Sequence, residues 1–285
     1  MPNVLFPPDG PQTVSQVLDS AFRIFKISLV RCLLFGAVAM IAGQLPNIYS
    51  LARGEPFGGY LRGDPITIAL AVLGSALAVY FSAVILIRQR EVAQGSRRAI
   101  RAELAEGLRR MPTLIGVSWL SLVIVAVVPA MLFVSIVKQV VPPSAHLAIV
   151  IAAAVVAVPV VWLLPGLSVA VVVAVLTPSG VFASLKQGIW LAYRSWWRTM
   201  LTFMVWAVLL IVLNLVAVIL LMLSLQVFGA SDVITLSAAT PVAFVALRAV
   251  GLPFLVAILL AVYGELIVRK HGVDLERRVT GAVQA

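Results

Sequence analysis

Six long runs of apolar residues, nearly free of charged side chains, constrain this chain more than any other feature. The runs extend approximately over Ser28–Tyr49, Ile66–Ile87, Thr113–Val137, Leu147–Leu176, Met200–Phe228 and Val242–Val268. About 20 apolar residues in a helix cross about 30 Å of hydrocarbon, where the backbone finds no partners outside its own segment. The runs lack the period-two alternation of barrel strands. The sequence therefore predicts an all-α, polytopic bundle of six transmembrane helices.

The composition agrees with lipid as the main solvent of this chain. Of the 285 residues, 62% are hydrophobic and 11% are charged, whereas soluble domains hold about 25% charged residues. The single cysteine, Cys32, lies inside the first run, and we expect it to pack as a small apolar side chain. Residues 1–22 lack the pattern of a signal peptide, so we expect them to be retained.

Four prolines lie inside the apolar runs, at positions where each removes a backbone hydrogen bond. They are Pro129, Pro159, Pro165 and Pro253. We predict kinks at these positions, which serve the packing of the helices more often than they serve as hinges.

The Lys and Arg residues are distributed unequally between the two sides of the predicted bundle. Seventeen flank the side that holds both ends of the chain, three flank the other side, and Arg248 lies within a run. Basic residues accumulate on the cytoplasmic side of membrane proteins, so both termini are predicted to be cytoplasmic. This topology accounts for the formal charge of +10. We therefore expect no nucleic-acid partner.

A short amphipathic helix is predicted before the first, third and fifth runs. The three apolar faces are Val14, Val17, Leu18, Ala21 and Phe25; Ile100, Leu104, Leu108 and Met111; and Phe182, Leu185, Ile189, Tyr193 and Trp196. Thr13 and Gln16 form a predicted capping box at the start of the first copy. Each copy ends in basic residues, which are candidate contacts for anionic lipid headgroups. These residues are Arg23, Lys26, Arg109, Arg110, Arg194 and Arg198, and they recur every 84–88 residues.

This recurrence predicts three parallel repeats, each with an amphipathic helix and two spans. The repeats cover about 13–90, 96–176 and 180–270 of a membrane domain at 13–270, between cytoplasmic tails at 1–12 and 271–285. The amphipathic helices are expected to lie in the membrane interface. They serve either as anchors of the hairpins or as elements that sense lipid or dock a partner.

Two segments resemble a known family. The segment Thr13–Lys26, TVSQVLDSAFRIFK, resembles the "igeiLdaafrlyr" opening of bacterial six-span proteins grouped with the membrane domain of glycerophosphoryl diester phosphodiesterases. The segment Gly180–Arg198 is similar to that family's "g..aAlrrSwrL..g.wwr" element, although Gln187-Gly188 stands where an Arg-Ser pair is usual. The resemblance implies a multi-pass protein of a bacterial inner membrane. It does not imply the phosphodiesterase activity, because the short stretch after the sixth run cannot hold that domain.

No catalytic pattern is found in the sequence. A nucleophile with its base, a His-Glu-x-x-His zinc motif and a glycine-rich phosphate loop with its lysine are all missing. The two histidines, His146 and His271, lie on opposite sides of the predicted membrane and cannot share a metal ion. We therefore expect no enzyme, no cofactor and no metal site.

Three polar residues within the runs are candidates for an intramembrane site, since polar groups there are costly. They are Asn214, Arg248 and Glu265. We expect Asn214 to bond a neighbouring helix. Arg248 is expected to reach the interface or to pair with Asp232, and Glu265 to pair with Arg269 one turn later.

Two classes of function remain open. The first is a lipid-interacting, accessory or scaffold component of the cell envelope, whose partners are membrane lipids and either other envelope proteins or a second copy. The alternative is a transporter or channel for a small or amphiphilic solute, which needs several polar groups around a cavity at the midplane. Because such groups are sparse in the runs, the sequence favours the first class.

Overall fold

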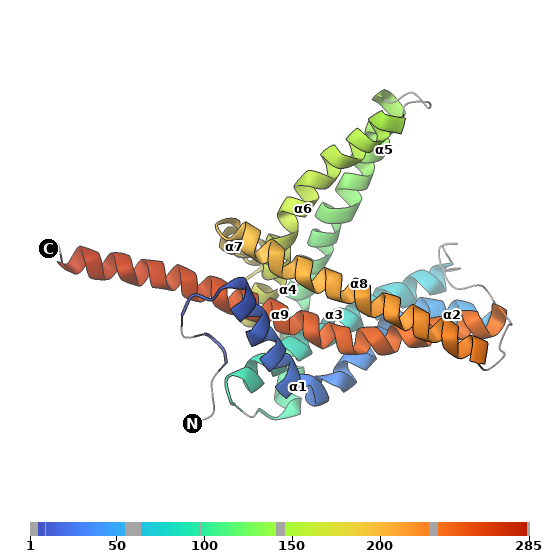
Figure 1. Ribbon diagram of the computed structural model, residues 1–285, viewed down its shortest axis with the longest axis horizontal. Coiled ribbons are helices and arrows are strands. Elements are labelled where there is room, and N and C mark those ends of the chain that lie inside the picture. The colour runs from blue at the N-terminus through green and yellow to red at the C-terminus, as the bar shows by residue number, and fades with distance from the viewer. Residues whose placement is uncertain are drawn as a thin grey trace.

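The structure is a computed structural model that describes the backbone of residues 5–8, 10–54, 64–96, 98–140, 146–227 and 233–283. Within these ranges it does not describe the side chains of 137–140, 146–152, 217, 220, 221, 224–227, 233–244 and 271–283. Every regular element in the described ranges is a helix (Figure 1). The elements are α1 (Val14–Gly43), α2 (Leu45–Ala52), α3 (Pro65–Ala93), α4 (Ile100–Leu122), the π-helical turn η2 (Val123–Val127), α5 (Val128–Val140), α6 (His146–Leu176), α7 (Val181–Tyr193), α8 (Trp196–Val227) and α9 (Val233–Val283).

Six described helical segments are long and apolar enough to cross a membrane. They are Val14–Gly43, Pro65–Ala93, Ile100–Ile136, Ala153–Leu176, Trp196–Val216 and Val245–Lys270. Each segment overlaps one of the six predicted runs. The prediction of an all-α bundle with six candidate spans is therefore confirmed.

The helices are arranged as a packed group and a diverging hairpin. Helix α1 packs against α3 and α9, and α8 packs against α9. In Figure 1 the hairpin of α5 and the first part of α6 points away from these helices. The start of α1, the helix α7 and the C-terminal part of α9 lie toward one end of the molecule, which we call the inner end.

Glycines allow the closest helix contacts in the packed group. A Cβ on Gly36 of α1 would lie 2.4 Å from the carbonyl oxygen of Ala249 on α9, and a Cβ on Gly74 of α3 would lie 2.2 Å from that of Ala42. Small residues let helix backbones approach closely, and this is the main route to packing in lipid. These glycines therefore fix how near α1 lies to α3 and α9.

Pro253 explains part of this contact. As a proline it has no N–H to donate to the Ala249 carbonyl one turn earlier, and Gly36 brings α1 against that carbonyl. The carbonyl of Pro253 itself accepts a hydrogen bond of 2.7 Å from Nε2 of Gln89 on α3. The region around one proline thus joins three helices.

The other prolines have unequal effects. The π-helical turn η2 ends just before Pro129, which cannot donate to the carbonyl of Val125. The helix geometry is therefore altered next to Pro129, as its position predicts. Helix α6, in contrast, is one helix through both Pro159 and Pro165.

The three amphipathic segments do not form three separate helices, so this part of the sequence interpretation is corrected. The first and second segments are continuous with their spans, in α1 and in α4. In α4, Pro112 lies between the amphipathic segment and the span, but the helix continues through it. Figure 1 shows α1 changing direction near its middle. The third segment alone is a separate helix, α7, and the Thr13–Gln16 capping box of α1 is confirmed.

The segment that we predicted as an N-terminal tail packs on the inner end in part. The N–H of Leu5 donates to the carbonyl of Ala93 at 2.8 Å, and Phe6 is 6% exposed. A Cβ on Gly264 would lie 2.8 Å from the Phe6 ring, so the absence of a side chain there makes room for Phe6. We call residues 5–8 and 10–12 the N-terminal strap. At the other end of the chain, α9 continues as a helix to Val283, through most of the predicted C-terminal tail.

Candidate functional site

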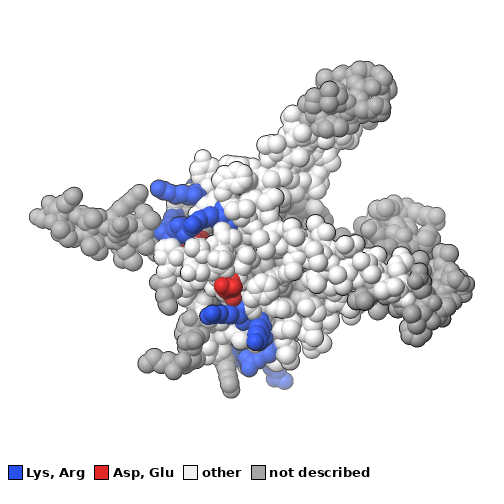
Figure 2. All heavy atoms as spheres, viewed as in Figure 1, with Lys and Arg blue, Asp and Glu red and all other residues white. Residues whose placement is uncertain are grey.

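Basic residues gather at the inner end. Figure 2 shows the Lys and Arg side chains of the visible face concentrated there, over the region of α7, α9 and the start of α1. Away from this end, the described residues on the face shown carry no such cluster of charged side chains. The described part of the visible face is therefore divided between a charged end and an uncharged body.

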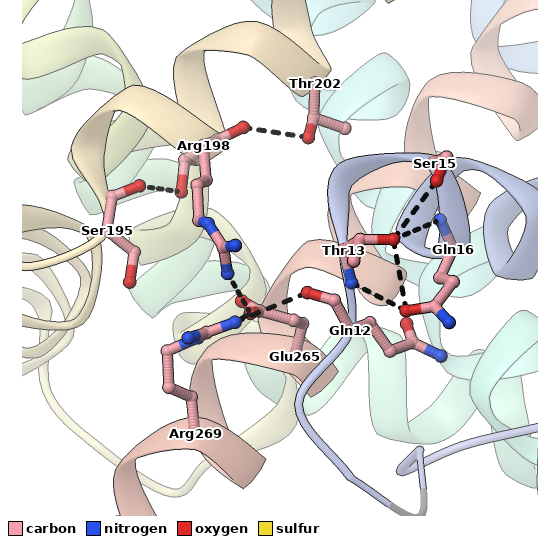
Figure 3. A network of polar contacts seen from close by, with 10 residues as sticks. Gln12, Thr13, Ser15, Gln16, Ser195, Arg198, Thr202, Glu265 and Arg269 are labelled. Carbon is pink, nitrogen blue, oxygen red and sulfur yellow. Dashed lines mark hydrogen bonds and ion pairs between the residues drawn. The ribbon is translucent and has the colours of Figure 1, made fainter.

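A network of polar contacts lies within this basic end (Figure 3). Glu265 of α9 is 5% exposed, and its Oε1 accepts a hydrogen bond of 2.7 Å from Nε of Arg269. This pair, one turn apart, confirms the predicted partner of Glu265. Arg198 of α8 places Nη1 3.9 Å from the same carboxylate oxygen. Arg269 also donates from Nη2 to the carbonyl of Gln12 in the strap, at 3.3 Å.

These residues surround a small recess between α1, α8 and α9, which we call the inner recess. Its lining residues are Gln12, Val14, Val17, Arg198, Thr199, Thr202, Val262 and Glu265. Thr199 and Thr202 are both buried, and their hydroxyls donate to the carbonyls of Ser195 and Arg198. The recess thus has apolar walls on α1 and a polar wall on α8 and α9.

Local sequence signals position the walls of the recess. Thr13 and Gln16 exchange hydrogen bonds, Thr13 N to Gln16 Oε1 at 2.8 Å and Gln16 N to Thr13 Oγ1 at 3.4 Å. This capping box fixes where α1 begins. Helix α8 begins at Trp196, directly after α7, so Arg198 lies in its first turn. The starts of α1 and α8 both face the recess, and each adds a partial positive charge.

The charges of the recess do not cancel. Two guanidinium groups face one carboxylate, which leaves one positive unit in excess. Glu265 and Arg269 form the close pair, whereas Arg198 is more distant and its side chain is 46% exposed. Among the described residues, Glu265 is the ionic partner of Arg198. The excess charge of the recess therefore resides on Arg198.

Exposed aromatic side chains lie on α7 at this basic end. Helix α7 exposes Phe182, Trp190 and Tyr193 and buries Leu185 and Gly188. The predicted apolar face of this helix is therefore split, because Leu185 packs inward while Phe182 and Tyr193 point outward. Exposed aromatic residues of this kind are typical of the interface between lipid and water.

The junction of α7 and α8 is held by a second aromatic contact. The indole of Trp196 donates a hydrogen bond of 2.8 Å to the carbonyl of Trp162 on α6. The rings of Trp162 and Tyr193 meet edge to face, with centroids 5.7 Å apart. Trp197, the next residue of α8, is 71% exposed. These contacts fix the orientation of the first turn of α8, which carries Arg198.

The three intramembrane candidates do not form one site. Asn214 donates to the carbonyl of Leu210 in its own helix at 2.7 Å, so the prediction of a bond to a neighbouring helix is wrong. Arg248 is exposed, and its predicted partner Asp232 lies outside the described residues. The inner recess contains Glu265 but neither Asn214 nor Arg248.

The six predicted lipid contacts occupy different environments. Five are exposed at the surface: Arg23, Lys26, Arg109, Arg194 and Arg198. Arg110 is half-buried and donates to the carbonyl of Thr177 at 3.2 Å, so it links α4 to the end of α6. Arg198 lines the inner recess.

The sequence reasoning missed a buried ion pair between α3 and α4. Nη1 of Arg88 lies 3.1 Å from Oε2 of Glu103, and the two side chains are 13% and 4% exposed. The guanidinium also lies over the ring of Phe35, 5.4 Å from its centroid. The sequence offers only the helical spacing of Glu103, Gly107 and Leu114, which places them on one face of α4; the structure shows that all three are buried.

Comparisons of the chain with protein-family models, with curated proteins and with solved structures find no match. The resemblance of the segments at 13–26 and 180–198 to the phosphodiesterase membrane-domain family therefore stays a prediction. Within the described ranges, no three His, Cys, Asp or Glu side chains are grouped as a metal site would require.

Proposed function

We propose that this protein is a non-catalytic, lipid-interacting accessory or scaffold component of a bacterial cell membrane, with its inner end in the cytoplasm. The observation that carries the proposal is the common location of the basic residues and the exposed aromatic residues of α7 at one end of an apolar molecule. Anionic lipids attract such an end with about 1 kcal/mol for each Lys or Arg near the surface.

The exposed surface of the spans supports the membrane part of this proposal. Large apolar side chains face outward on several helices, such as Val30, which is 87% exposed, Leu34 at 69% and Met131 at 67%. In water this surface would be costly. Six helices with such surfaces indicate an integral membrane protein in which acyl chains cover these residues.

The transport alternative receives less support from the described residues. A transporter places several polar groups around a site near the midplane. Here Asn214 bonds its own helix, and of the three intramembrane candidates Glu265 alone lines the inner recess. This recess lies at the charged end of the molecule.

Site-directed cysteine labelling tests the orientation. The buried Cys32 is replaced by Ala to give a background without cysteine, and Gln187→Cys on α7 or Arg53→Cys at the end of α2 is added. In intact cells, a membrane-impermeant maleimide should label position 53 and not position 187. Labelling of position 187 alone would overturn the proposed orientation.

The dependence of the unfolding temperature on lipid charge tests the proposed interaction with anionic lipids. We expect the full chain to unfold at a higher temperature in nanodiscs that contain phosphatidylglycerol than in nanodiscs of phosphatidylcholine alone, because the inner end attracts negative charge. Equal unfolding temperatures at low salt would contradict the proposal. High salt should reduce the difference, since it screens exposed charges.

A further inference from the structure

We propose that a single phosphate group binds at the mouth of the inner recess, with the exposed guanidinium of Arg198 as its main contact. The inference deepens the proposed lipid interaction and rests on it for the source of the phosphate. A lipid headgroup and free inorganic phosphate share the chemistry that the recess recognises.

The state of the Arg198 guanidinium is the first argument. A guanidinium carries five N–H donors in a planar fork that matches the oxygens of a phosphate. The contact of Arg198 with Glu265, at 3.9 Å, is longer than a hydrogen bond. Within the described part of the chain, Arg198 thus keeps its donors available while lying beside a recess.

The second argument is the charge balance of the recess. The close pair of Glu265 and Arg269 is neutral, and Arg198 adds one positive unit. A phosphodiester carries one negative charge, so it would match the single positive charge that Arg198 adds beside the recess. Arg198 is also in the first turn of α8, where the helix dipole favours an anion.

The third argument is depth in the membrane. Trp196 and Trp197 directly precede Arg198, and Trp197 is 71% exposed. Tryptophan is enriched at the level of the lipid headgroups. The neighbouring residues therefore place Arg198 at the depth of headgroup phosphates, whereas Thr202, one turn further along α8, is buried.

Glu265 has a defined part in this arrangement. Its carboxylate orients Arg269, which in turn holds the strap through the carbonyl of Gln12. The same carboxylate lines the recess and repels an anion bound there. Glu265 therefore weakens phosphate binding while it orders the wall of the recess.

Binding of defined ligands to the full chain in detergent tests the proposal. The ligands are short-chain phosphatidylglycerol, short-chain phosphatidylcholine and inorganic phosphate, and native mass spectrometry measures the bound molecules. Arg198→Ala should weaken phosphatidylglycerol binding at least about tenfold, as expected for the loss of a charged hydrogen bond. The matched control is Arg194→Ala, one turn earlier and exposed outside the recess; its affinity should stay within about twofold.

The charge-conserving and carboxylate variants add a second readout. Arg198→Lys should keep part of the affinity, since it retains the charge but loses the planar fork. Glu265→Gln, of nearly the same shape, should bind phosphatidylglycerol several-fold more tightly because a repulsive charge is removed. Weaker binding by a folded Glu265→Gln protein would overturn the role assigned to Glu265.

The outcomes separate this inference from the function on which it rests. If the chain binds inorganic phosphate but neither lipid, and Arg198→Ala abolishes this binding, the phosphate site at the recess is supported. The phosphate would then come from a soluble compound and not from a lipid headgroup. An equal loss of phosphatidylglycerol affinity in Arg198→Ala and Arg194→Ala would overturn the phosphate site at the recess. A diffuse attraction of the basic end to anionic lipid would then explain the binding. If phosphatidylglycerol and phosphatidylcholine bind equally and no variant differs, both the inference and the proposed function fail.

Discussion

Two candidate spans of nearly equal hydropathy have opposite surroundings in this protein. The most apolar window of Val245–Lys270 has a mean hydropathy of 2.4, and half of it, 50%, is buried. The corresponding window of Ile100–Ile136 has a mean hydropathy of 2.5 and is 0% buried. Hydropathy thus indicates which segments enter the membrane, but it does not indicate which of them pack on each other.

The difference follows from side-chain size and polar contacts. Lipid tails are as apolar as leucine, so apolar surface alone gives helices no reason to associate. The packed group of α1, α3 and α9 has Gly36 at a backbone contact and Gln89 as a link between helices. The exposed part of the second hairpin, from η2 through α5, presents larger side chains such as Val127, Met131 and Leu132.

The largest effect is expected where α4 joins the packed group. Glu103→Ala leaves the buried Arg88 without its ionic partner, and we expect a loss of about 3–5 kcal/mol in the free energy of unfolding. Unfolding in mixed micelles measures this loss of free energy. Arg53→Ala, which breaks the exposed pair with Asp64 and leaves the Asp64 cap of α3 in place, should cost at most about 1 kcal/mol. Equal losses in the two variants would show that burial of the pair does not matter.

A smaller effect is expected within the packed group. Gly36→Ala places a Cβ 2.4 Å from the carbonyl of Ala249, so α1 and α9 must separate, at a cost of about 1–3 kcal/mol. Gly251→Ala on α9 is the matched control, because its nearest neighbour, a methyl of Leu210, is 3.9 Å away. If both alanines are equally well tolerated in the same unfolding assay, close backbone contact does not hold this group together.

The junction of α7 and α8 should respond more weakly. Trp196→Phe keeps most of the ring but removes the hydrogen bond to the carbonyl of Trp162, and we expect a loss of about 0.5–1.5 kcal/mol. The unfolding temperature in detergent measures the change. Trp197→Phe, at an exposed ring, is the control. A larger loss in the control would mean that the interface anchors the junction more than this bond does.

The smallest effect is expected on the diverging hairpin. Met131 is 67% exposed, so Met131→Ala should change the free energy of unfolding by less than about 0.5 kcal/mol. The measurement is made in lipid nanodiscs with one chain per disc and again at high protein density. A clear loss of stability at high protein density alone would mean that a second copy covers this hairpin. The difference in burial between the two spans would then hold only for the isolated chain.

The sequence predicts those features that depend on local patterns. The six spans follow from run length, the start of α1 follows from Thr13 and Gln16, and the pair of Glu265 and Arg269 lies within one helix turn. Asn214 shows a limit of this reasoning, because its side chain donates a hydrogen bond to the carbonyl of Leu210, four residues earlier in the same helix.

The rest depends on contacts between distant segments. No local pattern brings Gln12 and Arg198 together at one recess, and Arg269 bonds a residue 257 positions earlier in the chain. Periodicity identifies an amphipathic segment but does not determine whether a helix ends after it, so α1 and α4 run directly into their spans while α7 does not.

The N-terminal strap has a consequence for how the protein is made. Its first described residue bonds Ala93 at the end of α3, Phe6 packs on Gly264, and Gln12 accepts from Arg269. A ribosome synthesises the strap before α3 and long before α9, which holds Gly264 and Arg269. The contacts of Phe6 and Gln12 with α9 must therefore form late in assembly, whereas the bond of Leu5 to Ala93 of α3 can form earlier. A bulky group fused directly before Leu5 would accordingly disturb the completion of the fold and leave the insertion of the earlier helices intact.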